Sequence, residues 1–146
     1  MKLKNKVKVF VSVVLLLALT TTLMMPAAAI EEGAKYNNTV STSSYAAISS
    51  AGKLTVDVSY NGIPGVTTKG VITTYVERRV LGIFWSKVNI GQPNNEWVDT
   101  SYNYYYATSH SHQLTKTGTY RITVNYKISG TGGATDNIDY QVTRSY

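Results

Sequence analysis

Two histidines, His110 and His112, stand two positions apart and are the only histidines in the 146-residue chain. On a strand, residues i and i+2 point to the same face, so the two rings could share a metal ion. A metal site normally needs about three or four ligands, and the nearest acid, Asp99, lies 11 positions before His110. We therefore expect no metal or other cofactor, and expect the pair to lie in a solvated loop before a turn at residues 116–118.

The carboxylates give no sign of a catalytic pair. A glycosidase needs two carboxylates at a fixed separation, and no local signature indicates one. The sequence also has no G-x-S-x-G elbow, Walker A loop or H-E-x-x-H motif. A non-enzymatic protein is the better interpretation, and a small metal-dependent hydrolase using the histidine pair is the weakest alternative. The notable acids are Glu77, Glu96, Asp99, Asp136 and Asp139.

Aromatic residues gather in one segment, residues 97–108, which reads as a long strand. On such a strand Tyr102, Tyr104 and Tyr106 share one face and Tyr105 has the other. Both faces cannot be core in a two-sheet sandwich, so one set should be exposed. Exposed aromatic patches often mark binding sites. The candidate ligand-binding residues are Trp97, Tyr102, Tyr104, Tyr105 and Tyr106.

A second apolar feature is the run over residues 81–85, Leu-Gly-Ile-Phe-Trp. Continuous apolar runs often mark buried strands, which favours core. The alternative is an unusually apolar hairpin tip that touches a membrane. On that alternative the contacting residues would be Leu81, Ile83, Phe84 and Trp85.

Alternating apolar and polar residues, separated by Gly, Pro and Asn turns, predict an all-β fold. The pattern is clearest where Tyr120, Ile122, Val124, Tyr126 and Ile128 alternate with polar residues. Strands are expected near residues 39–48, 54–60, 71–80, 83–90, 97–108, 119–128 and 138–142.

About seven antiparallel strands in some 110 residues favour an immunoglobulin-like two-sheet sandwich, with a small closed barrel as the alternative. Tyr120 follows Gly118 and Thr119 as in a tyrosine corner, in which the hydroxyl returns to the backbone just upstream. Ile122 would then be core, and Trp85 is a candidate for the centre of the core.

The N-terminus has the pattern of a secretory signal peptide: four lysines, an apolar run and Ala27-Ala28-Ala29. We expect cleavage after Ala29, a mobile segment over residues 30–38 and a domain over residues 39–146. No lipid-attachment cysteine or C-terminal anchor is visible, so no permanent membrane anchor is expected.

Four of the 14 basic residues lie in this leader. The rest of the chain has 10 basic and 8 acidic residues, a net charge of +2, which argues against nucleic-acid binding.

The remainder of the chain carries several short motifs: Tyr-Asn-Asn-Thr, Ser-Ala-Gly-Lys, Gly-x-x-Gly-x-Thr-Thr, Trp-Ser-x-Val and Lys-Thr-Gly-Thr-Tyr-Arg, which begin at residues 36, 50, 62, 85 and 116. With Tyr-Lys at residues 126–127, before a Gly-rich turn, and a terminal Ser-Tyr, this pattern resembles a family of small secreted proteins from Clostridia, Bacilli and related Firmicutes whose function is unassigned. The resemblance implies a fold and no functional residues.

The expected function is that of a secreted protein that binds an extracellular or cell-envelope ligand, either a glycan, a wall polymer or a protein. A secreted bacteriocin-like or membrane-active antagonist is the alternative that the apolar run at residues 81–85 supports.

Overall fold

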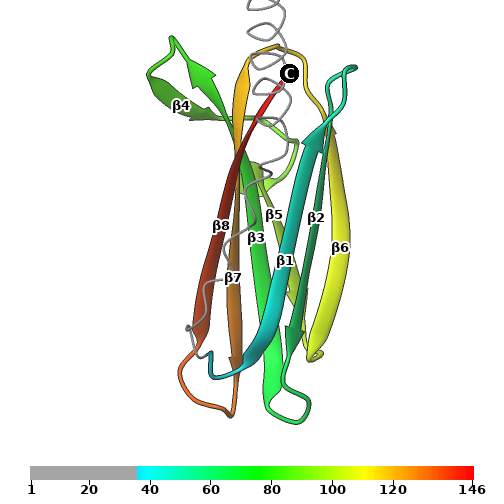
Figure 1. Cartoon of the computed structure of the whole chain (residues 1–146), viewed down its shortest axis with the longest axis vertical. Helices are drawn as coiled ribbons and strands as arrows, with labels where there is room; N and C mark the ends of the chain where they lie inside the picture. Colours follow the sequence, from blue (N-terminus) through cyan, green and yellow to red (C-terminus); the bar gives the residue numbers. More distant parts are fainter. Residues whose placement is uncertain (1–35) are drawn as a thin grey trace, which may run out of the picture. The chain divides into compact units, whose positions relative to one another are not determined.

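The structure, a computed structural model, describes residues 36–146 (Figure 1). These residues form eight β-strands and one short 3-10 turn. In chain order the elements are β1 (Thr39–Ile48), β2 (Lys53–Gly62), β3 (Thr67–Val80), β4 (Phe84–Lys87), η1 (Pro93–Asn95), β5 (Glu96–Ser101), β6 (Tyr105–Gln113), β7 (Thr119–Gly130) and β8 (Asp136–Ser145).

The strands form two antiparallel sheets, with order β1-β2-β6 in one and β4-β3-β7-β8 in the other. β5 also pairs with β3, beside the middle of that strand, whereas β4 pairs with its last residues. β1 lies against β8, and β5 lies against β6, so the sheets face each other as two layers. The predicted all-β, two-sheet architecture is confirmed, with eight strands where about seven were expected.

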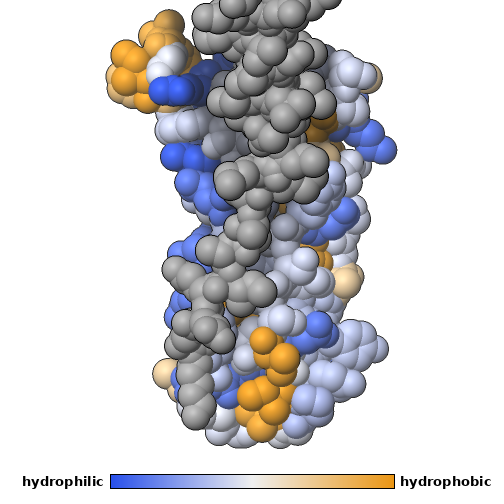
Figure 2. All heavy atoms as spheres, viewed as in Figure 1, coloured by the Kyte–Doolittle hydropathy of each residue, from blue (hydrophilic) through white to orange (hydrophobic). Residues whose placement is uncertain are grey.

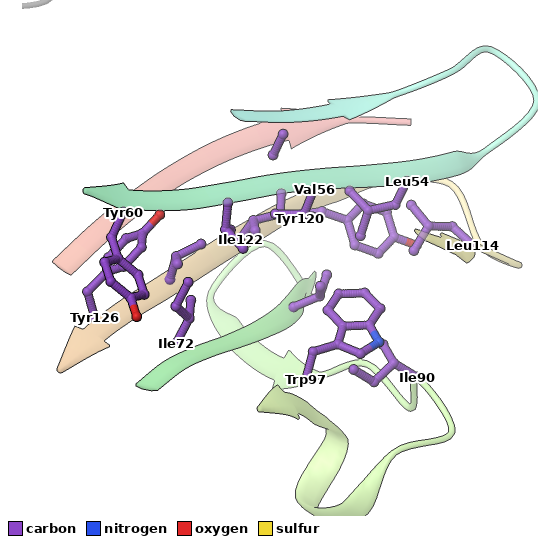
Figure 3. Packing of buried hydrophobic residues seen from close by; sticks show 14 of the residues in the cluster. Leu54, Val56, Tyr60, Ile72, Ile90, Trp97, Leu114, Tyr120, Ile122 and Tyr126 are labelled. Atoms are coloured by element: carbon purple, nitrogen blue, oxygen red, sulfur yellow. The ribbon is translucent and has the colours of Figure 1, made fainter. Parts of the chain in front are cut away.

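The core lies between the sheets and follows the alternation in the sequence (Figure 3). Every second residue of β2 is buried, from Leu54 to Tyr60, and β7 buries the predicted set from Tyr120 to Ile128. Ile122 is fully buried, as expected. Because one face of each strand is removed from water, the period of two fixes which side chains point inward.

Tyr120 makes the predicted return to the backbone, since its hydroxyl donates a hydrogen bond to the carbonyl oxygen of Lys116. Burial raises the pKa of Tyr120, partly offset by the positive charge of Arg78. Burial also raises the pKa of Tyr126, whose hydroxyl contacts Ser44 on β1 across the sandwich. Both phenols therefore stay neutral. The Tyr126 hydroxyl joins β7 to β1, whereas the Tyr120 hydroxyl holds the connection just before β7.

Asp136, at the start of β8, ties the N-terminal end of the described chain to the sandwich. Its carboxylate accepts hydrogen bonds from the backbone N–H of Asn37 (2.9 Å) and Asn38 (2.8 Å) and from the hydroxyl of Thr39 (2.8 Å). Burial of Asp136 opposes ionisation, but these hydrogen bonds together outweigh it and lower its pKa. Asn37 and Asn38 belong to the segment that the sequence predicted to be mobile, yet Asp136 holds both of them.

The predicted signal peptide at residues 1–29 lies outside the described residues, as do residues 30–35. The described residues cluster as one compact unit with its own core. Among the residues that the structure describes, no helix is long and apolar enough to span a bilayer.

Candidate functional site

Three exposed tyrosines lie where the chain passes from β5 to β6: Tyr102 and Tyr104 in the connection and Tyr105 as the first residue of β6. We call them the tyrosine surface. They are 74%, 44% and 57% exposed. The single strand predicted over residues 97–108 is wrong, because the chain turns at residues 102–104 and crosses from one sheet to the other. This turn gathers the three rings at the end of the sandwich where β6 begins.

Hydrogen bonds from β2 hold this turn in place. The Tyr60 hydroxyl donates to the carbonyl oxygen of Asn103 at 2.8 Å, and the N–H of Gly62 donates to that of Tyr104 at 2.6 Å. Gly70 on β3 leaves room for the Tyr60 ring, since a Cβ at that position would lie 2.4 Å from it. The tyrosine surface is therefore preorganised, which lowers the entropy lost on binding a ligand.

The rings of the tyrosine surface present both faces and edges. Tyr104 and Tyr105 meet edge to face, with ring centroids 5.1 Å apart and an interplanar angle of 70°. The ammonium nitrogen of Lys69 lies 5.7 Å from the ring centroid of Tyr102. The surface thus combines apolar rings, phenol hydroxyls and one positive charge.

Trp97 and Tyr106, predicted as ligand contacts, point into the sandwich instead. Trp97 is 8% exposed and pairs with the fully buried Thr74 of β3. Tyr106 is half-buried and pairs with Tyr60, with ring centroids 6.4 Å apart. The prediction that Tyr106 shares an exposed face with Tyr102 and Tyr104 is wrong, because those two precede the strand.

The two histidines lie on β6 and not in the predicted loop. His110 Nε2 lies 2.7 Å from Asp99 Oδ2, and its ring stacks on Trp97 with centroids 4.9 Å apart and planes 4° apart. These three side chains close the edge of the sandwich between β5 and β6. Within residues 36–146, no three His, Asp or Glu side chains come together as a metal site. Sequence spacing missed the His110–Asp99 contact, because it joins strands from different sheets.

The β3–β4 hairpin exposes an apolar tip, made of Leu81, Ile83 and Phe84, which are 83%, 71% and 62% exposed. Leu81 (φ 51°) and Gly82 (φ 70°) both have left-handed backbone, which makes a tight reversal beyond the end of the core. Figure 2 shows the resulting hydrophobic cluster over this hairpin. The interpretation of this run as buried core is therefore wrong for Leu81, Ile83 and Phe84, which form an exposed hairpin tip.

Trp85 is not the central core residue that the sequence suggested. It lies half-buried on the outer face of β4, a strand that only β3 flanks. Two guanidinium groups lie over its ring, with the guanidinium carbon of Arg79 5.9 Å and that of Arg121 4.4 Å from the ring centroid. Trp97 takes the expected place in the core (Figure 3).

Comparisons of the chain with protein-family models, with curated proteins and with solved structures find no match. The functional interpretation therefore depends on the geometry of the chain itself.

Proposed function

We propose that this chain is a secreted, non-enzymatic, immunoglobulin-like sandwich that binds a glycan, wall polymer or protein at the cell surface through its tyrosine surface. The observation that carries the proposal is the joint exposure of Tyr102, Tyr104 and Tyr105 at one anchored turn and the first residue of the strand that follows it. A soluble protein gains nothing in stability from large rings held in water, so such clusters usually serve binding.

Two observations support the finer parts of this proposal. The sheet orders β1-β2-β6 and β4-β3-β7-β8, with the Tyr120 hydroxyl bonded back to Lys116, are typical of immunoglobulin-like sandwiches. The lysine-rich start, apolar run and alanines of residues 1–29 support secretion.

Among the three ligand classes, a glycan suits the tyrosine surface best. Tyrosine offers an apolar ring face beside a hydroxyl that donates and accepts hydrogen bonds. A sugar presents C–H faces and hydroxyls in the same arrangement. The steeply inclined rings of Tyr104 and Tyr105 would contact two sides of one sugar, while the Lys69 ammonium beside Tyr102 would reach an acidic substituent.

The test is binding of residues 30–146 to insoluble bacterial cell walls, measured by co-sedimentation. Tyr104→Ala should abolish pelleting and leave the thermal midpoint unchanged, because Tyr104 is not part of the buried core. Tyr45→Ala is the matched control, since Tyr45 is 58% exposed on β1 but lies away from the turn. Equal pelleting of the Tyr104 variant and the wild type would refute the site.

A second candidate function is contact with a membrane, which the apolar tip favours. Exposed Leu, Ile and Phe at the end of a hairpin would enter the interface of a bilayer. A membrane-active antagonist should release dye from liposomes, and a Phe84→Ser variant should release less. An inert wild-type protein in this assay would remove this candidate.

A further inference from the structure

A pocket of about 340 Å³ opens near the end of β6 opposite to the tyrosine surface. Its walls come from the β3–β4 hairpin, from residues 86–89 and from the connection between β6 and β7. Three basic side chains line it, Arg78, Lys87 and Lys116, together with His112. No Asp or Glu is among its lining residues.

The pocket lies between the last residues of β3 and the connection from β6 to β7. Arg78 follows the fully buried Val76 on the same face of β3, so it points toward the core side just beyond the core. One guanidinium nitrogen of Arg78 lies 3.4 Å from the carbonyl oxygen of Thr117, across the gap. Tyr120 and Leu114 lie at the base of the opening.

The nearby carboxylates already form ion pairs on the outer face of the sheet that contains β3. Glu77 pairs with Arg121 at 2.7 Å, and Glu96 pairs with Lys87 at 2.5 Å. Within residues 36–146, Arg78 and Lys116 have no carboxylate partner within 4 Å. The pocket therefore holds two positive charges that the described part of the chain does not compensate.

We propose that this pocket binds a phosphate group carried on a small polar molecule. Arg78 supplies a planar fork of donors and Lys116 a point charge from the opposite wall, a combination that suits a tetrahedral anion. The side-chain amide of Asn89 lines the same space and adds a neutral donor. The pocket is near the lower end of the usual size of ligand sites, so it has room for a phosphate and a short polar group.

The position of the pocket gives two sources for this phosphate: a free phosphate ester or a lipid headgroup. Val80 lines the pocket and pairs with Phe84, so the pocket lies directly beside the apolar tip. A tip that entered a bilayer would bring lipid phosphates level with Arg78. Phosphate binding in this pocket is independent of the tyrosine surface, which lies at the other end of β6.

The test compares two double variants with the same change in net charge. Arg78→Gln with Lys116→Gln removes the pocket charges. Arg79→Gln with Lys127→Gln removes two exposed charges that do not line the pocket, one on β3 and one on β7. Amide shifts of residues 30–146 are followed by NMR during titration with inorganic phosphate and with glycerol phosphate. We expect shifts at Asn89 and Gln113, with affinity at least about tenfold weaker in the pocket variant, because charge-assisted hydrogen bonds are lost.

Co-sedimentation with vesicles separates the two sources. If the pocket binds a lipid headgroup, the wild-type protein should pellet with phosphatidylglycerol vesicles but not with phosphatidylcholine vesicles. The pocket variant should lose this pelleting, and the control variant should keep it. A free phosphate ester predicts the NMR shifts without vesicle binding. The proposal is overturned if neither probe binds, or if both double variants weaken binding equally, because that result shows unspecific charge attraction.

Discussion

Removing the carboxylate of Asp136 should destabilise the sandwich strongly, because this one group holds the start of the described chain. Asp136→Ala leaves three donors without their acceptor: the N–H groups of Asn37 and Asn38 and the hydroxyl of Thr39. Asn37 is exposed, so water replaces its partner, but Asn38 and Thr39 are 0% and 6% exposed. Each buried unpaired donor costs about 1–3 kcal/mol, so the loss should be about 2–6 kcal/mol.

Urea unfolding of residues 30–146, followed by tryptophan fluorescence, measures this loss. For a domain of this size, about 2 kcal/mol already lowers the thermal midpoint by about 8 °C. Asp139→Ala is the control on the same strand, because Asp139 is exposed and makes one solvent-exposed hydrogen bond, to the side-chain amide of Asn125. It should change stability by less than about 0.5 kcal/mol. A loss below about 1 kcal/mol for Asp136→Ala would refute the reasoning.

The dependence of stability on pH in acid should report the same hydrogen bonds to the Asp136 carboxylate. The pKa of Asp136 is lower in the folded state than in the unfolded chain, so unfolding takes up a proton between the two values. Its contribution is complete above about pH 4, the unfolded pKa, and is lost as the pH falls through the folded pKa. Asp136→Asn should flatten this part of the stability curve. If the free energy of unfolding of the variant falls with acid as steeply as that of the wild type, other carboxylates cause the acid dependence.

Three further predictions concern the core, the corner and the tip. Trp97→Ala should cost about 3–5 kcal/mol in urea unfolding, because it empties a buried site and removes the ring that stacks on His110. Tyr120→Phe should cost about 0.5–1.5 kcal/mol, the net value of its hydrogen bond to Lys116, and a neutral result would argue against the corner. Phe84→Ser should leave the thermal midpoint within about 2 °C, because the ring is 62% exposed, and a large drop would mean that the tip is packed.

The sequence predicts best the strands in which one face is buried and the other is wet. β1 begins and ends at the expected residues 39 and 48, and β7 buries the expected set, because alternation reports burial directly. The sequence does not predict the turn at residues 102–104, because that turn contains no Gly or Pro. Hydrogen bonds from Tyr60 and Gly62 hold that turn, and these residues lie some 40 residues earlier in the chain. No local sequence pattern could therefore predict it.

The two tryptophans show the same limit. An apolar run around Trp85 favours core, yet the strand that carries it has one neighbour, and two arginines cover the ring. Trp97 looked like an exposed anchor and is buried instead. Hydropathy gives the tendency of a side chain to leave water, whereas the order of strands in the sheet decides which side chain does so. Asp99 and His110 likewise meet only because β5 and β6 close the same edge.

Binding through the tyrosine surface is best tested by co-sedimentation with purified cell walls. Residues 30–146 are compared with a variant in which Tyr102, Tyr104 and Tyr105 are alanine, and with Tyr45→Ala, after all three proteins are shown to unfold at similar temperatures. We predict that the wild type and Tyr45→Ala pellet with walls and that the triple variant stays in the supernatant. Equal pelleting of all three, or of none, would contradict the tyrosine surface as a binding site.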